Sequence, residues 1–168
     1  MNLYIIRHGL AAELGEQGNY QDSQRPLTEV GRKKVRKIAR GLRALQVSFD
    51  LILSSPYLRA RETAEILAAE FEAREKFKVV EALRPPLNVP ALLSTIYQQT
   101  AVENLALVGH EPDLSGLTSL LLTGGTGLAL SMKKGGVCAL SVWGELRLGR
   151  CAQLEWLATP AQLIGIEP

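Results

Sequence analysis

The sequence predicts an α/β fold of three layers, in which helices cover both faces of a mostly parallel central sheet with an antiparallel edge. Short apolar runs such as Leu3–Ile6 and Leu105–Val108 alternate with amphipathic helical patterns, as expected of parallel strands joined by helices. No linker divides the 168 residues, which predicts a single domain, 1–168. Hydrophobic residues at 46% and charged residues at 21% are typical of a globular core and exclude disorder as the main state.

Charge and composition limit the partners that we expect. A formal net charge of +2 is too balanced to imply nucleic-acid binding. The N-terminus lacks a signal-peptide layout, and no stretch approaches the roughly 20 apolar residues of a membrane span, so we expect no membrane association. Cys138 and Cys151 form no CxxC pair, which is typical of reduced thiols in a cytosolic protein. We therefore expect a cytoplasmic chain and favour a monomer.

The first strand and the first helix have clear signals. Leu3–Ile6 is a continuous apolar run, which predicts a strand buried on both faces. Thr28 is expected to cap a helix that continues to about Leu45 and has one apolar and one basic face. The apolar face is Val35, Ile38, Ala39, Leu42 and Leu45, and the other carries mostly Arg32, Lys33, Lys34, Arg36, Lys37, Arg40 and Arg43. The basic face is either solvated or attracts an acidic partner.

A second strand and helix follow directly. Leu51–Leu53 predicts a buried strand, and Ser55 and Pro56 are expected to open a helix with a capping hydroxyl and a proline at its first position. The buried stripe of that helix is Ala60, Ala64, Leu67, Ala68 and Phe71.

The remaining elements complete the alternation. Phe77–Ala82 is the third predicted strand, and Ala91–Gln98 is a short helix after a loop with three prolines. Leu105–Val108 is the fourth buried strand, and Pro112 starts another helix.

A late pair of strands accounts for the antiparallel edge. Val137–Trp143 and Arg147–Trp156 alternate more loosely, and Gly144 and Glu145 between them suggest a hairpin.

Three residues with catalytic chemistry follow buried strands. His8 comes after the first strand, Arg59 lies in the helix after the second, and His110 comes after the fourth. Ligands of such sheets bind at the carboxyl ends of the strands, where these residues converge. A neutral imidazole is a nucleophile toward phosphorus, and arginine forks neutralise phosphoryl oxygens. The helix expected at Pro56 points free N–H groups at an anion, and Arg25 lies in a loop long enough to reach the same site.

Four segments resemble the histidine phosphatase superfamily, also called the phosphoglycerate mutase-like fold. Leu3–Gly9 resembles its Arg-His-Gly signature, and Arg25–Gly31 resembles its R-x-L-T-x-x-G segment. Ser54–Ala64 is similar to its S-S-x-x-x-R-A-x-x-T-A block, and Val108–Pro112 to the segment with its second histidine. The short length, which leaves no large helical insert, and the ending Leu154–Pro160 resemble the SixA-type phosphohistidine phosphatases.

This resemblance implies a role for each residue of the motifs. His8 would be the nucleophile that becomes transiently phosphorylated, and Arg25 would reach in from its loop to bind substrate. Gly9 and Ser55 belong to the same motifs and are expected among the substrate-binding residues. The phosphate pocket itself would consist of Arg7, Arg59 and His110. The resemblance also implies a hydrolase without a metal or another cofactor.

One departure from the family concerns the proton donor. Larger members have a carboxylate in the loop after the third strand, where this chain reads Leu83–Pro90 without Asp or Glu. Glu81 is expected within the preceding strand, and Glu13, Glu16 and Asp22 of the first loop are the other candidates.

The lack of an acid in this loop bears on the substrate. An alkoxide leaving group needs a proton, whereas a phosphorylated imidazole leaves more readily. The expected function is therefore a phosphohistidine phosphatase in signal transduction, with a phosphorylated histidine-containing phosphotransfer protein as its partner. The alternatives are a small-molecule phosphomonoesterase with the same nucleophile and a phosphoprotein-binding module without turnover.

Overall fold

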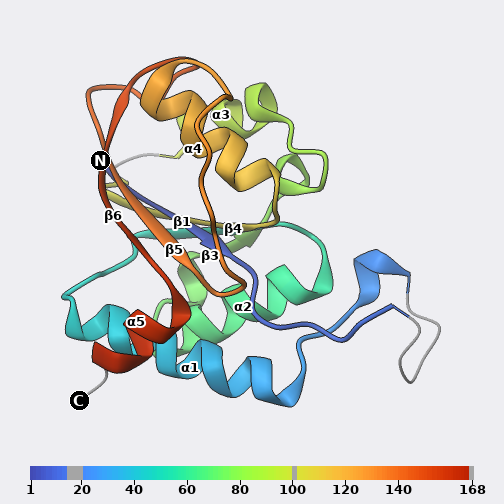
Figure 1. Cartoon of the computed structure of the whole chain (residues 1–168). Helices are drawn as coiled ribbons and strands as arrows, with labels where there is room; N and C mark the ends of the chain where they lie inside the picture. The colour runs from blue at the N-terminus through green and yellow to red at the C-terminus, as the bar shows by residue number, and fades with distance from the viewer. Residues whose placement is uncertain (15–20, 100–101, 167–168) are drawn as a thin grey trace.

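The computed structural model describes residues 1–14, 21–99 and 102–166 and contains one six-stranded sheet between two layers of helices (Figure 1). The strands are β1 (Asn2–Arg7), β2 (Leu51–Ser54), β3 (Phe77–Val79), β4 (Asn104–Gly109), β5 (Val137–Val142) and β6 (Ala152–Ala158). The helices are α1 (Glu29–Ala44), α2 (Leu58–Glu70), α3 (Val89–Tyr97), α4 (Asp113–Thr123) and α5 (Pro160–Ile166). Three short 3-10 turns are η1 (Asp22–Gln24), η2 (Arg74–Lys76) and η3 (Glu81–Leu83).

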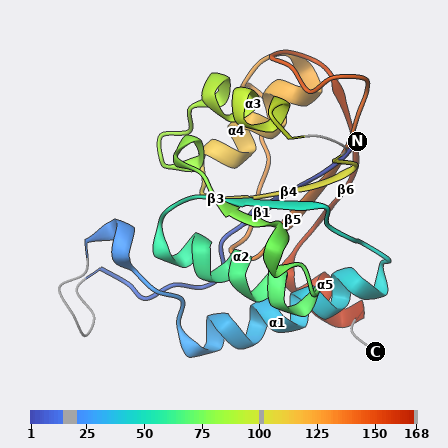
Figure 2. The same ribbon diagram turned by 180° about the vertical axis from the view of Figure 1, so that it is seen from behind.

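The sheet has the order β3-β2-β4-β1-β5-β6 and is parallel from β3 to β1. Strand β5 runs antiparallel to both β1 and β6, so the predicted mostly parallel sheet with an antiparallel edge is confirmed. Helices α1, α2 and α5 cover one face, and α3 and α4 cover the other (Figure 2). In β1, Leu3 and Ile5 enter the core under α3 and α4, while Tyr4 and Ile6 enter the opposite core. The continuous apolar run is explained by this burial of both faces.

Helix α1 follows the sequence pattern closely. Thr28 Oγ1 accepts a hydrogen bond from the backbone N–H of Gly31 at 2.9 Å, so the predicted cap is confirmed. Leu45 is a correction, because it follows the last helical residue and is 42% exposed. The end of the helix turns this position away from the core.

Helix α2 begins later than predicted. It starts at Leu58, and Ser55 and Pro56 lie before it, so the expected opening at these two residues is wrong. Tyr57 is in an extended conformation, with φ −65° and ψ 132°, which delays the helix. The Ser55 hydroxyl instead accepts from the Tyr57 N–H at 3.3 Å and lies 2.8 Å from Nε2 of His110.

Two predicted strands extend too far. Strand β3 pairs with only three residues of β2 at the sheet edge, and Glu81 and Ala82 lie in the turn η3, so placing Glu81 in a strand is wrong. Strand β6 begins at Ala152 rather than Arg147. The reason is that the N–H of Cys151 donates to Leu121 of α4, which draws this connection toward the helix.

Close helix packing explains the position of α5, which the sequence analysis did not anticipate. A Cβ added at Gly41 of α1 would lie 2.0 Å from the carbonyl oxygen of Leu163, so only glycine allows this approach. No helix in the described residues is both long and apolar enough to cross a bilayer.

We expect Gly41→Ala to destabilise the fold, because the added methyl group forces α5 away from α1. The matched control is Gly116→Ala in α4, where an added Cβ meets nothing within 4 Å. The control should gain up to about 1 kcal/mol from the higher helix propensity of alanine. Urea unfolding gives the free energy of unfolding of each variant. Equal values for the two variants would contradict the packing account.

Candidate active site

His8 lies at the carboxyl end of β1 and is 5% exposed. Its Nδ1 is 2.7 Å from the carbonyl oxygen of Gly9, which can only accept a hydrogen bond. Its Nε2 is 3.2 Å from Nε of Arg59, which can only donate. Together these contacts favour the tautomer with the proton on Nδ1 and the lone pair on Nε2.

His110 lies beside His8, with ring centroids 5.1 Å apart. Its Nε2 hydrogen-bonds the buried hydroxyl of Ser55, and the ring of Tyr57 packs edge-on at 5.1 Å. Its Nδ1 is buried and has no partner among the described residues. An unpaired buried nitrogen is costly, and an anion in the site would satisfy it when it carries a proton.

Both imidazoles are electrically neutral at pH 7. Burial lowers the pKa of His8 from 6.5 to about 3. The positive charges of Arg59 and Arg7, and repulsion from His110 if it were protonated, act in the same direction, and the Gly9 hydrogen bond opposes them. Burial likewise lowers the pKa of His110 to about 3, with Arg59 adding to the effect. A neutral imidazole has one unprotonated ring nitrogen, which a nitrogen nucleophile requires.

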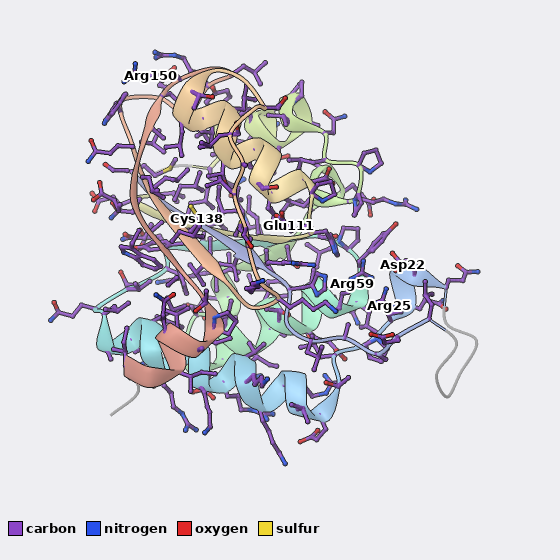
Figure 3. All side chains as sticks on the ribbon, viewed as in Figure 1. Asp22, Arg25, Arg59, Glu111, Cys138 and Arg150 are labelled. Carbon is purple, nitrogen blue, oxygen red and sulfur yellow. The ribbon has the colours of Figure 1, made fainter. Side chains whose placement is uncertain are left out.

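Arg59 reaches the site from the first turn of α2 and contacts the segment before α1 (Figure 3). Its Nη1 donates to the carbonyl oxygen of Asp22 at 2.6 Å and its Nη2 to Oδ2 of Asp22 at 3.1 Å. Arg25 donates to Oδ1 of the same carboxylate at 2.8 Å and to the carbonyl of Ala12 at 2.7 Å. Asp22 therefore connects Arg25 to Arg59.

The carboxyl group of Asp22 is ionised at neutral pH. Its partial burial alone would raise the pKa, but Arg59 and Arg25 hold the pKa below its ordinary value of 3.8. A carboxylate of this kind binds arginine well and is a poor proton donor.

Arg7 is anchored to a distant segment. Its Nη1 donates to the carbonyl of Met132 at 2.7 Å, and the N–H of Gly135 donates to the carbonyls of Arg7 and His8. Its Nε is buried without a partner among the described residues. Arg7 thus has hydrogen-bonding capacity left for an anion at this end of the sheet.

Gly9 and Ser55 contact the histidines directly, and among the described acid candidates Asp22 contacts the arginines of the site. Glu81 pairs with Arg84 at 3.7 Å and has a 75% exposed side chain, and Glu13 is exposed. Glu16 lies outside the described residues. A proton-donor role for any of these carboxylates stays a prediction.

Thr63 is a supporting residue that the sequence reasoning did not single out. Its hydroxyl accepts from the N–H of Gly9 at 3.0 Å and donates to the carbonyl of Arg59 at 2.7 Å. A Cβ at Gly9 would lie 2.7 Å from the side chain of Val35, so glycine permits the close approach. The threonine of the Ser54–Ala64 motif was the available signal, whereas nothing local marks Met132.

Comparisons with known proteins found a family and several similar chains. Residues 3–84 match the family described as "Histidine phosphatase superfamily (branch 1)". The chain is 39% identical over 142 residues to an uncharacterised protein of Picosynechococcus sp., which covers 83% of this chain and 84% of that protein. It is 32% identical over 129 residues to the phosphohistidine phosphatase SixA of Escherichia coli, which covers 75% of this chain and 77% of that protein.

The fold is also shared with a solved structure of the protein histidine phosphatase SixA complexed with tungstate. The TM-score is 0.79 at 24% sequence identity, over 97% of this chain and 99% of that chain.

The two lowered histidine pKa values predict that stability falls as the pH drops from about 6.5 toward 3. In this window the unfolded chain binds protons that buried His8 and His110 do not, so acid favours unfolding. From pH 7 to pH 5 the loss for the pair is on the order of 3 kcal/mol. Urea unfolding of the His8→Asn/His110→Asn variant should show a shallower decline, and an equal decline in both proteins would contradict the buried neutral state.

Proposed function

The chain belongs to the histidine phosphatase superfamily (branch 1), and on that premise we propose that it hydrolyses phosphohistidine on a phosphotransfer protein through a covalent intermediate on His8. The observation that carries this proposal is the pair of contacts that leaves the lone pair on Nε2 of His8. The Gly9 carbonyl accepts from Nδ1, and Nε of Arg59 lies beside Nε2.

The first chemical step forms a bond from Nε2 of His8 to phosphorus as the bond from phosphorus to the leaving nitrogen breaks. Positive charge develops on the His8 ring, and the hydrogen bond from Nδ1 to Gly9 stabilises it. The donors of Arg59 and Arg25 that now contact Asp22 turn to the phosphoryl oxygens. Water then attacks phosphorus, the bond from phosphorus to Nε2 breaks, and phosphate leaves with the protons of the water, which restores the lone pair on Nε2.

The available carboxylates favour phosphohistidine over a phosphate ester. Asp22 is ionised and paired with two arginines, and Glu81 faces solvent beside Arg84. A leaving alkoxide gains about 10²–10⁴-fold from a positioned acid, and a leaving imidazole needs less help. The SixA relative, 32% identical, is named a phosphohistidine phosphatase, which supports the same substrate class.

The absence of a large insert is consistent with a protein substrate. Between β3 and β4 the described residues form only η3, the short helix α3 and loops. A site without a covering domain admits a side chain presented on a folded protein.

His8→Ala should lower turnover of a phosphohistidine protein by at least about 10³-fold, since no other described group replaces the nucleophile. The wild-type chain should form an acid-labile phosphoenzyme labelled on His8, and the variant should not. Rapid-quench labelling and mass spectrometry measure both. Full turnover by the variant would contradict the mechanism, and faster hydrolysis of sugar phosphates than of phosphohistidine protein would favour the phosphomonoesterase alternative.

Asp22→Asn should tighten binding of inorganic phosphate severalfold, because the phosphate no longer competes with a carboxylate for Arg25 and Arg59. Glu81→Gln removes the same charge from an exposed position and should not change phosphate binding. Isothermal titration calorimetry with phosphate compares the variants. Weaker binding by Asp22→Asn would show that the carboxylate positions the arginines and does not compete with phosphate.

A further inference from the structure

The basic face of α1 divides into two parts with different surroundings. Its arginines lie against α2, where Arg32 pairs with Glu62 at 2.9 Å and Arg43 donates to the carbonyl of Glu70 at 3.0 Å. These cations are therefore partly neutralised by the neighbouring helix.

Two of its lysines lie on the other side, whereas Lys33 pairs with Glu29. Lys34 and Lys37 precede Gly41 by about two turns and one turn, so they share the side that meets α5 at Leu163. Both are exposed, and no described residue pairs with either of them. Val30, on the same row, is 54% exposed. This side of α1 thus carries unpaired positive charge and exposed apolar surface together.

Two more lysines connect this surface to the active site. Lys133 and Lys134 are exposed and have no side-chain partner among the described residues. They lie between Met132, which binds Arg7, and Gly135, which donates to the carbonyl oxygens of Arg7 and His8. Gly135 also packs closely, since an added Cβ would lie 2.8 Å from a side-chain carbon of Ile38 in α1. The segment with the two lysines is therefore held against both the active site and α1.

A shallow depression lies between Lys34 of α1 and Lys133. It has a volume of ≈ 690 Å³ and is bordered by Lys34 and Lys133, with an apolar floor from α5 that includes Pro160, Ala161 and Ile164. We call Lys34, Lys37, Lys133 and Lys134, with this floor, the lysine face.

We propose that the lysine face binds an acidic surface on the phosphorylated protein and directs its phosphohistidine into the site beside His8. This inference rests on the proposed function, and it adds that the docking surface of the protein substrate is negatively charged. Four lysines without partners in the described part of a chain of net charge +2 make a local positive field that attracts a negative protein. The apolar floor gives contact area for a protein surface, and the adjoining arginines and histidines receive the phosphoryl group.

The test reverses charge on the lysine face. Lys133→Glu/Lys134→Glu should lower kcat/KM at least about tenfold toward a phosphohistidine-containing phosphotransfer domain of net negative charge, at low salt. Hydrolysis of free phosphohistidine should stay within about twofold of wild type, because the site itself is intact. Added salt should lower kcat/KM for the wild-type chain more steeply than for the variant.

The matched control is Arg147→Glu/Arg150→Glu, which makes the same change in net charge on exposed residues of the β5–β6 connection, at the opposite end of β5 from Lys133 and Lys134 (Figure 3). Equal kcat/KM for the two double variants would overturn the proposal. So would wild-type protein turnover by Lys133→Glu/Lys134→Glu with loss of binding to phosphatidylserine vesicles, which would assign the face to membranes. If the wild-type chain acts on no phosphohistidine protein, the proposed function itself is contradicted. That result is measured on the wild-type chain alone, so it is distinct from a failure of the lysine face.

Discussion

The hydrogen bond between Nδ1 of His8 and the carbonyl of Gly9 is the contact on which the chemistry of the site depends. It fixes the ring orientation and leaves Nε2 as an acceptor beside Arg59. Thr63 extends this control, because its hydroxyl contacts both the Gly9 N–H and the Arg59 carbonyl. The lack of a Cβ at Gly9 allows this loop to lie against α1. The end of β1, the loop at Gly9 and helix α2 together orient Nε2 of His8.

The concentration of positive charge at the site is the second constraint. Arg59 and Arg25 converge on buried histidines, which stay neutral because burial opposes further charge. Asp22 pairs with both arginines. In the proposed function the site receives an incoming dianion, and the lysine face adds a weaker positive field outside it. We propose that the orientation of the His8 ring, its neutral state and the anion-binding arginines work together.

The sequence predicted the order of the elements, because buried parallel strands and amphipathic helices have strong periodic patterns. It also predicted that His8, Arg59 and His110 meet, since parallel strands end at one edge. It was wrong where tertiary contacts decide local structure, as in the start of α2 after Ser55 and the turn at Glu81. Contacts of Arg7 with Met132 could not be predicted, because 125 residues separate them.

The most direct measurement of the central claim is the protonation state of the His8 ring. The chain has only two histidines, so a long-range ¹H–¹⁵N NMR spectrum, assigned with a His110→Asn variant, resolves both rings. At pH 7 we expect a neutral His8 with its proton on Nδ1 and an unprotonated Nε2. A charged His8 imidazolium, or a neutral ring with the proton on Nε2, would contradict the account of the nucleophile.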